Sequence, residues 1–471
     1  FNLVQYCFDL LNLAEKLQNN ILRGVSSNVG PDLDDIYVRA AMLCRINSMG
    51  RGISAISPEN FKKYVDMYNA GIIPCVPEKG SLGASGDLGP LAYIALVATG
   101  AWRAKYQGEI MSGEEALKRA GLEAARLSYK EGLAMINGTS MMVGVAAPLL
   151  YGAKRLVKQF CLVSAISLEA LKGKIMPYHP TVHKNKPHPG QIKVADAIWT
   201  TLADSKMVVQ DEEVDRWLSS MRTGEPQGMD QQIEDAYSMR ATPQILGPSL
   251  DAIWSADQTL QIEINSTNDN PLVIVEEGDA FHNAHFHGQY VSQAMDHLSI
   301  AVVNMCNLSD RRIDRYLDPH HNNGLPPFLC KEDPGLRHGL MGGQYCAASI
   351  MADMRSLCHP VSIQTLTTTG DFQDHVSMGL VAARRARDIV DNAYYIPAFE
   401  LICACQAVDQ RDEGAAALSS VTRSIYEMVR ELVPYLDHDE ALGDYISDVS
   451  NLLREGRLLT ALPNGDLDWD D

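Results

Sequence analysis

The sequence has little basic charge, no apolar run of membrane length and no paired cysteine motif. Its 59 acidic residues outnumber its 40 basic residues, which gives a formal net charge of −19. That charge would repel the phosphate backbone of a nucleic acid. The apolar stretch LGPLAYIALVATGAW is too short to span a bilayer and contains glycine and proline. We therefore expect a chain that binds neither nucleic acid nor membrane.

The ten cysteines are scattered and form no C-x-x-C pair. This usage is typical of free thiols in a reducing cytoplasm. The stretch FHNAHFH brings His282, His285 and His287 close in sequence. A metal site is one interpretation, but no carboxylate or cysteine completes the ligand set, and we expect no metal ion. The chain opens on FNLVQYC, without an initiator methionine or a signal peptide, so we also expect residues upstream of residue 1.

Alternating strand patterns are scarce as well, whereas the periodicity of helices dominates the chain. The sequence predicts three long apolar helical segments, with kinks at Pro148 and Pro397, over residues 139–172, 288–317 and 377–409. Helices of this length suit the core of a bundle. We therefore predict a mainly α fold with a central bundle of long helices. A division near residue 140 would separate an amino-terminal segment, residues 1–140, from a long-helix segment, residues 141–471.

A glycine-rich stretch, GSLGASGDLGP at residues 80–90, precedes an apolar run. It matches neither a phosphate-binding loop nor the G-x-S-x-G pattern of a nucleophile elbow. An ordinary flexible turn is one interpretation. The other is a backbone that reacts with itself, because glycine permits strained dihedral angles and leaves its nitrogen accessible.

The second interpretation has a definite chemistry at Ala84-Ser85-Gly86. The amide nitrogen of Gly86 would attack the carbonyl carbon of Ala84 and close a five-membered ring. Loss of water from the ring and of the Ser85 hydroxyl would leave an exocyclic methylidene, an electrophile that standard side chains do not provide. Asp87 is placed to assist proton transfer, and Pro90 would stand in the first turn of a helix whose positive end faces the loop.

The surrounding motifs favour the second interpretation. The stretch GSLGASGDLGPLAYIAL resembles the signature of the aromatic amino acid ammonia-lyase and aminomutase family, which includes histidine, phenylalanine and tyrosine ammonia-lyases. Other stretches resemble the family's motifs in the same order along nearly the whole chain: LQNNILRGVSSNVG, KEGLAMINGTS, KPHPGQ, IEDAYSMRATPQILGP, NSTNDNPLV, FHNAHFHGQ, GLPPFL and DFQDHVSMG. The likeness is greatest to the bacterial phenylalanine aminomutases and phenylalanine ammonia-lyases.

The resemblance implies that Ala84, Ser85 and Gly86 form 4-methylideneimidazol-5-one (MIO) without an external cofactor, within the amino-terminal segment. It also implies an ammonia-lyase-like fold, mainly α, in a homotetramer whose active sites are shared between subunits. A single chain would then be inactive.

Four further residues match catalytic or substrate-binding positions of the family. Arg240 in YSMR matches the arginine that captures the substrate carboxylate, a task that suits a planar guanidinium. Tyr237, one helical turn earlier, matches a tyrosine near the MIO ring and is expected on the same face as Arg240. Asn137 matches the asparagine that contacts the MIO carbonyl or the substrate carboxylate, and Phe286 matches the phenylalanine beside the ring. Each position also admits a structural interpretation, as a surface ion pair, a core aromatic or an Asn-Gly turn.

The expected substrate follows from positions that differ among family members. Histidine lyases carry glutamate where this chain has Gln373, and tyrosine lyases carry histidine where it has Gly24, followed by Val25. Neither Gly24 nor Val25 offers a hydrogen bond to a phenol, so phenylalanine is favoured over histidine and tyrosine. An apolar pocket for the substrate ring is expected from Ile21, Val25, Leu133 and Phe372.

By resemblance, the reaction eliminates ammonia from L-phenylalanine and gives trans-cinnamate. If ammonia adds back at the β-carbon before cinnamate leaves, the product is β-phenylalanine. Retention of cinnamate depends on loop closure, so ammonia-lyase and aminomutase both stay open. A tyrosine ammonia-lyase or aminomutase is the alternative among the enzymes.

A non-catalytic family member that acts as a binding or assembly protein is the alternative from another class. The family's catalytic base, a tyrosine in a YGVN-like stretch, is expected before residue 1, and Tyr6 lies in no such motif. Glu234 and His285 also depart from the family, where many members have glutamine and asparagine. The intact Ala84-Ser85-Gly86 and Arg240 argue for the enzyme.

Overall fold

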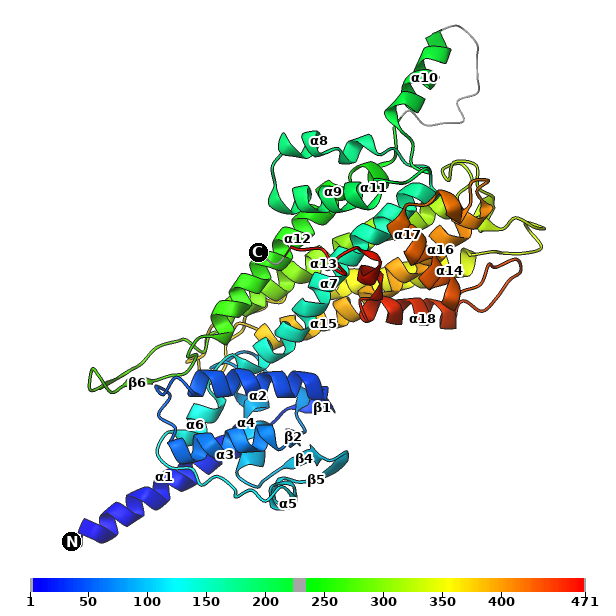
Figure 1. Ribbon diagram of the computed structural model, residues 1–471. Coiled ribbons are helices and arrows are strands. Elements are labelled where there is room, and N and C mark those ends of the chain that lie inside the picture. Colours follow the sequence, from blue (N-terminus) through cyan, green and yellow to red (C-terminus); the bar gives the residue numbers. More distant parts are fainter. Residues whose placement is uncertain (1–2, 223–233, 470–471) are drawn as a thin grey trace. The chain divides into compact units, whose positions relative to one another are not determined.

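The computed structural model describes residues 3–222 and 234–469 (Figure 1). These residues form mainly α-helices with three small antiparallel sheets, which confirms the predicted fold class. The chain divides into two compact units, each assembled from three stretches. Unit 1 comprises Phe1–Leu150, Ser255–His297 and His359–Arg387, and unit 2 comprises Tyr151–Trp254, Leu298–Cys358 and Asp388–Asp471. The units do not follow the division predicted at residue 140, because several long helices contribute residues to both.

Unit 1 is built around α4 (Leu88–Ala98), which packs against α1 (Leu3–Val25) and α6 (Glu131–Ile136). Every residue of α4 from Pro90 onward is buried, as expected for a helix that is apolar on all sides. The other elements that lie wholly in unit 1 are β1 (Val29–Asp32), α2 (Asp35–Met49), α3 (Pro58–Asn69), β2 (Ile73–Pro74), β3 (Pro77–Lys79), β4 (Arg103–Tyr106), β5 (Glu109–Ser112), α5 (Gly113–Arg119), β6 (Leu272–Ile274) and β7 (Asp279–Phe281).

The strands are paired as β1-β3, β2-β4-β5 and β6-β7. None of these described strands exceeds four residues, so the sequence offers too few positions for an alternating pattern to be recognised.

Unit 2 is a helical bundle around α16 (Tyr395–Gln410), which is buried at every residue from Ile396 to Val408. Its neighbours α14 (Met341–Leu357), α17 (Ser420–Leu432) and α18 (Gly443–Arg454) pack on it (Figure 1). The other α-helices that lie wholly in unit 2 are α8 (Pro180–Lys184), α9 (Pro189–Thr201), α10 (Asp211–Arg222) and α11 (Tyr237–Arg240). Four helices contribute residues to both units: α7 (Ser140–Ala170), α12 (Thr242–Ile264), α13 (Gln289–Leu317) and α15 (Gly379–Ala393).

Two of the three predicted long helices are confirmed as α7, which contains Pro148, and α13. The prediction of one helix over 377–409 is wrong, because this segment forms α15 and α16. Pro397 has no N–H to donate to the carbonyl of Ala393, so α15 ends there. The Ala393 carbonyl instead accepts the thiol of Cys306 at 3.7 Å.

Two further findings concern membrane-spanning helices and the state of the cysteines. Among the described helices, none is long and apolar enough to cross a lipid bilayer. The nine cysteines that the structure describes are free thiols.

Candidate active site

Residues 83–86 form a tight turn in unit 1. Gly83, Ser85 and Gly86 have positive φ angles of 79°, 55° and 76°, and the Gly86 amide donates to the Gly83 carbonyl at 3.2 Å. A side chain at Gly86 would overlap the carbonyl of Gly138. A positive φ at a residue with a side chain, as at Ser85, costs backbone free energy and needs support from its surroundings.

Asn137 contributes to that support. Its Nδ2 donates to the Ser85 carbonyl at 2.8 Å, and its Oδ1 accepts the amide of Asn270 at 2.9 Å. The carbonyl of the next residue, Gly138, accepts the Asp87 amide at 2.8 Å. The structure therefore brings Asn137 to the tripeptide, in the gap between α6 and α7.

Gln373 contacts the same turn from a loop. Its Nε2 donates to the Ser85 hydroxyl at 3.1 Å, and its Oε1 accepts the hydroxyl of Thr369 at 2.7 Å. The backbone of Gln373 exchanges two hydrogen bonds with Thr368, which fixes the direction of the side chain. A neutral amide, and no carboxylate at this position, therefore faces the Ser85 hydroxyl.

Asp87 is a fully buried carboxyl group at the start of α4. Its oxygens accept the Ser81 hydroxyl at 2.8 Å and the Met142 amide at 2.7 Å. Burial raises the pKa of Asp87 from 3.8 to about 7, although both donors favour the charged form. Pro90 lies in the first turn of α4, as predicted.

The predicted ring-pocket residues of α1 and α6 lie on two helices that pack together. The amide of Leu133 donates to the side-chain oxygen of Gln18 at 3.2 Å, so α1 and α6 meet there. Ile21, Val25 and Leu133 are half-buried, whereas Gly24 is exposed and has open space where a side chain would project.

The two predicted aromatic residues lie on loops. Phe286 follows β7 and is half-buried, and Phe372 is 83% exposed. Their contacts with MIO or with a substrate ring stay predictions.

Arg240 and Tyr237 lie in unit 2 on α11. The guanidinium carbon of Arg240 is 5.2 Å from the centre of the Tyr237 ring, which confirms that both side chains share one face. Arg240 also forms an ion pair with Glu234, and Tyr237 is 72% exposed. The Tyr178 hydroxyl donates to the Met239 carbonyl and anchors the short helix.

The histidine-rich stretch is arranged without a metal-binding cluster. The Nε2 atom of His287 lies 3.3 Å from the His375 carbonyl, and the two rings are 5.7 Å apart. Within residues 3–222 and 234–469, no group of three or more His, Cys, Asp or Glu side chains could hold a metal ion.

A pocket of unit 1 lies beside this stretch, lined by His285, His287, Glu263 and Asn268 among others. Glu263 accepts the hydroxyl of Thr139, and burial raises the pKa of its carboxyl group. His285 therefore lines a pocket whose Glu263 contacts Thr139, two residues after Asn137. Many family members have asparagine where this chain has His285.

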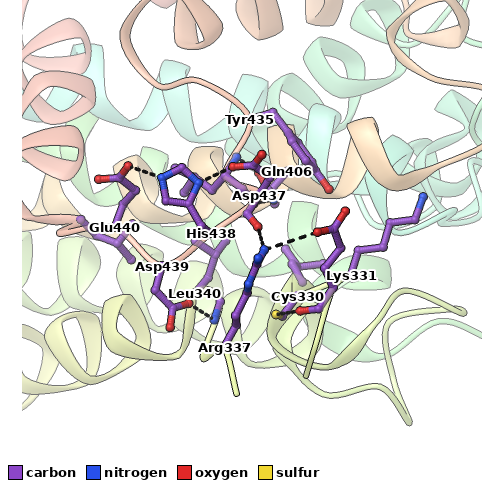
Figure 2. Close-up of a pocket in the computed structure, with 15 residues that line it drawn as sticks. Cys330, Lys331, Arg337, Leu340, Gln406, Tyr435, Asp437, His438, Asp439 and Glu440 are labelled. Carbon is purple, nitrogen blue, oxygen red and sulfur yellow. Dashed lines mark hydrogen bonds and ion pairs between the residues drawn. The ribbon is translucent and has the colours of Figure 1, made fainter. Parts of the chain in front are cut away.

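Figure 2 shows a pocket of unit 2 that contains none of the predicted site residues. Asp437 and Glu440 flank the imidazole of His438. Arg337 reaches the Asp437 carbonyl and the Glu332 carboxylate. Arg337 and His438 are therefore each paired with groups of this pocket.

The residues around Ala84-Ser85-Gly86 fit the MIO group. Ring closure between Gly86 and Ala84 would leave the Ser85 carbonyl as the carbonyl of the ring, and the Asn137 amide already points at that oxygen. Gly86 has no side chain to hinder its nitrogen, and Gln373 contacts the hydroxyl that dehydration would remove.

Two further residues, which no sequence-based prediction named, contribute to this region. Asn270 lies within the quoted motif NSTNDNPLV, so its motif was a usable signal. Arg45, which donates to the Asn137 carbonyl, lies in none of the quoted motifs.

The chain is similar to known proteins over most of its length. A family model described as aromatic amino acid lyase matches residues 11–431. The solved phenylalanine aminomutase of Pantoea agglomerans is 55% identical with a TM-score of 0.91, over 94% of this chain and 85% of that chain. A histidine ammonia-lyase of Natranaerobius thermophilus is 40% identical over 95% of this chain and 84% of its own length. A tyrosine ammonia-lyase of Cupriavidus metallidurans is 41% identical over 94% and 83%.

Proposed function

Because this chain belongs to the aromatic amino acid lyase family, we propose that it eliminates ammonia from L-phenylalanine through an MIO group formed by Ala84, Ser85 and Gly86. The products are trans-cinnamate and, where ammonia adds back at the β-carbon, β-phenylalanine. The observation that carries the proposal is the hydrogen bond from Asn137 to the Ser85 carbonyl, at a turn where Gly86 cannot hold a side chain.

When formed, MIO supplies an electrophilic carbon that makes the substrate amine a better leaving group. The residues of this chain would hold and polarise that group. Asn137 donates to the oxygen that becomes the ring carbonyl, where an amide donor stabilises developing negative charge. The amino-terminal end of α4, which begins at Leu88, adds the positive end of a helix dipole next to the tripeptide.

Arg240 is the proposed ligand of the substrate carboxylate. Its guanidinium suits two parallel hydrogen bonds to a carboxylate, and Glu234 is its present partner. Tyr237 and Phe286 are proposed neighbours of the reacting atoms. We further propose a cytoplasmic homotetramer in which several subunits contribute to each site, as the family resemblance implies.

Phenylalanine is the proposed substrate because Gln373 presents a neutral amide and Gly24 presents no side chain. The 55% identity to a phenylalanine aminomutase supports this choice. Tyrosine is the second candidate, since one relative at 41% identity is a tyrosine ammonia-lyase. The absence of a hydrogen-bonding side chain at Gly24 argues against a phenol.

Incubation of the protein with L-phenylalanine, L-tyrosine and L-histidine, followed by chromatography for arylacrylates and β-amino acids, tests the proposal. We expect cinnamate as the main arylacrylate, and the amount of β-phenylalanine separates lyase from aminomutase. Urocanate as the main product would contradict the choice of substrate. Ser85→Ala is the matched control, because no hydroxyl remains to eliminate, and its turnover should be abolished.

The non-catalytic alternative makes a different prediction. A binding or assembly protein would give no product and no ultraviolet signal that changes on treatment with a thiol or borohydride. That outcome with the tetrameric protein would overturn the enzyme proposal.

A further inference from the structure

We propose that Arg45 is a positioning residue for the formation of MIO, an inference that rests on the function proposed above. Arg45 lies on α2 and is fully buried. Its Nη1 donates to the Asn137 carbonyl at 2.7 Å, and its Nη2 donates to the Ala134 carbonyl at 2.6 Å. One guanidinium thus holds two backbone oxygens at the end of α6.

Those two carbonyls belong to a helix end that would otherwise lack donors. α6 ends at Ile136, so Ala134 and Asn137 lie where helical carbonyls have no partner within the helix. A cation at the carboxyl end of a helix also interacts favourably with its dipole. Arg45 therefore fixes the point at which Asn137 leaves the helix.

Asn268 holds the same segment from the other side of Gly138, and the pair Arg45 and Asn268 is called the clamp below. Its Oδ1 accepts Arg45 Nη1 at 3.3 Å and the Ser48 hydroxyl at 3.3 Å. Its Nδ2 donates to the Thr139 hydroxyl at 2.7 Å. A side chain at Gly138 would overlap both Arg45 and Asn268, so the backbone at this position lies directly against the clamp.

The clamped segment holds the backbone on both sides of Gly86. The Asn137 amide reaches the Ser85 carbonyl, and the Gly138 carbonyl reaches the Asp87 amide, both at 2.8 Å. Any shift of residues 137 and 138 would therefore move the backbone that must close the ring. Arg45 acts on ring closure through Asn137 and Gly138, without touching the tripeptide in any contact given by the structure.

Burying a charged side chain costs desolvation free energy that an apolar side chain would not cost. This cost argues that Arg45 has a positional role. Burial lowers the pKa of Arg45, and only the nearby charge of Asp269 and a weaker influence of Tyr64 oppose this effect. Apolar side chains of similar volume often replace a whole buried ion pair without loss of stability. An apolar side chain at this position would leave the Asn137 and Ala134 carbonyls without these donors.

Ring formation needs no oxidant or other reactant. The bond between the Gly86 nitrogen and the Ala84 carbon forms as one water leaves with the Ala84 oxygen and the amide hydrogens of Gly86 and Ser85. A second water carries away the Ser85 hydroxyl and its α-hydrogen. The mature chain is therefore lighter than the translated chain by two waters, which intact-mass spectrometry measures without any assay of activity.

The test compares the rate at which newly translated wild-type and Arg45→Lys chains lose water as they first fold, because a mature chain has already lost both waters irreversibly. Lysine keeps the charge but lacks the rigid fork that holds two carbonyls at once. Since a misplacement of about 1 Å can slow a reaction about 100-fold, we expect water loss to be about 10- to 100-fold slower. Ultraviolet difference spectra should show the same delay.

Arg312→Lys is the matched control, because Arg312 is equally buried but pairs with Glu400 in unit 2. It should lower the melting temperature without delaying water loss. An equal delay of water loss in both variants would show that general destabilisation slows ring formation. That result would overturn the inference.

The remaining outcomes separate the inference from the proposed function. Folded Arg45→Lys that loses two waters at the wild-type rate overturns the role of Arg45 alone. If Arg45→Lys does not fold, Asn268→Ser, which weakens the same clamp, must show the delay, and wild-type kinetics there would overturn the inference. A wild-type chain that never loses the waters overturns the proposed function and this inference with it.

Discussion

The side-chain amide of Asn137 donates to the carbonyl oxygen of Ser85 at 2.8 Å across 52 positions of the sequence. Gln373 donates a second amide to the hydroxyl of the same serine at 3.1 Å. Ser85 is therefore held at both of its oxygens by neutral donors. One of these oxygens would stay in the MIO ring and the other would leave, so the two amides should affect different steps.

Asn137→Ala should lower kcat for L-phenylalanine by about 100- to 1,000-fold, because it removes a donor from the oxygen that becomes the ring carbonyl. Intact-mass spectrometry should first give the fraction of chains that have lost two waters. Dividing the rate by this fraction makes it report on turnover and not on ring formation. Asn137→Asp, which keeps the size but places acceptors at that oxygen, should be equally impaired. Full activity in either variant would show that this hydrogen bond has no role in catalysis.

Asp87 should make the stability of the protein depend on pH. Its pKa is about 7 in the folded chain against an ordinary value of 3.8. The folded state therefore binds the proton more tightly, and stability should fall as the pH rises from 3.8 to about 7. Asp87→Asn removes this titration. Urea unfolding should be measured for both proteins at several pH values in this range. As the pH rises, the free energy of unfolding of the wild-type protein should fall relative to that of Asp87→Asn. A difference that does not change with pH would contradict the prediction.

Features set by local pattern could be predicted from the sequence, whereas those set by tertiary contacts could not. The periodic apolar residues predicted α7 and α13, and the geometry of proline placed Pro90 in the first turn of α4. Arg45 meets Asn137 across 92 positions. The sequence DIYVRAAMLCRINSM of α2 mixes polar and apolar residues and does not single out the arginine that is buried.

The break between α15 and α16 shows a second limit. Pro397 predicted a distortion at its own position, but its missing N–H acts on the carbonyl four residues earlier, at Ala393. The helix therefore ends before the proline, and Pro397 falls in the first turn of α16. In the site, the motif around Asn137 predicted a residue close to the tripeptide, and Asn268 lies in the motif NSTNDNPLV. Gln373 was predicted only to select the substrate, so its contact with the Ser85 hydroxyl was not foreseen, and Arg45 lies in no motif.

Gln373→Glu should shift the preference from phenylalanine towards histidine. It replaces the amide donor near the Ser85 hydroxyl with a carboxylate, which suits an imidazole better than a benzene ring. Since such pocket changes alter discrimination by about 10- to 200-fold, the ratio of kcat/KM for L-histidine to that for L-phenylalanine should rise within this range. Gln373→Met, which removes the amide without adding charge, should lower both values and leave their ratio in place. An unchanged ratio in Gln373→Glu would show that this position does not select the ring.

Gly24→His should raise the activity towards L-tyrosine. Gly24 lies near the end of α1, and no heavy atom lies within 4 Å of the position that a Cβ would take. The β-carbon of a histidine therefore meets no clash, and replacing glycine by histidine in a helix adds a few tenths of a kcal/mol of stability. An imidazole offers the phenol a hydrogen bond that Gly24 and Val25 do not, so the ratio of kcat/KM for L-tyrosine to L-phenylalanine should rise about 10- to 100-fold.

Gly24→Phe is the matched control for this change, because it adds similar bulk without a hydrogen-bonding group. If the ratio rises in Gly24→His and not in Gly24→Phe, the residue at position 24 selects the ring substituent by a hydrogen bond, and the half-buried faces of Ile21, Val25 and Leu133 are the walls of the ring pocket. If both variants keep the wild-type ratio, the pocket does not include this turn of α1. Thermal unfolding of both variants should show intact proteins, so that a change in the ratio reports on recognition and not on folding.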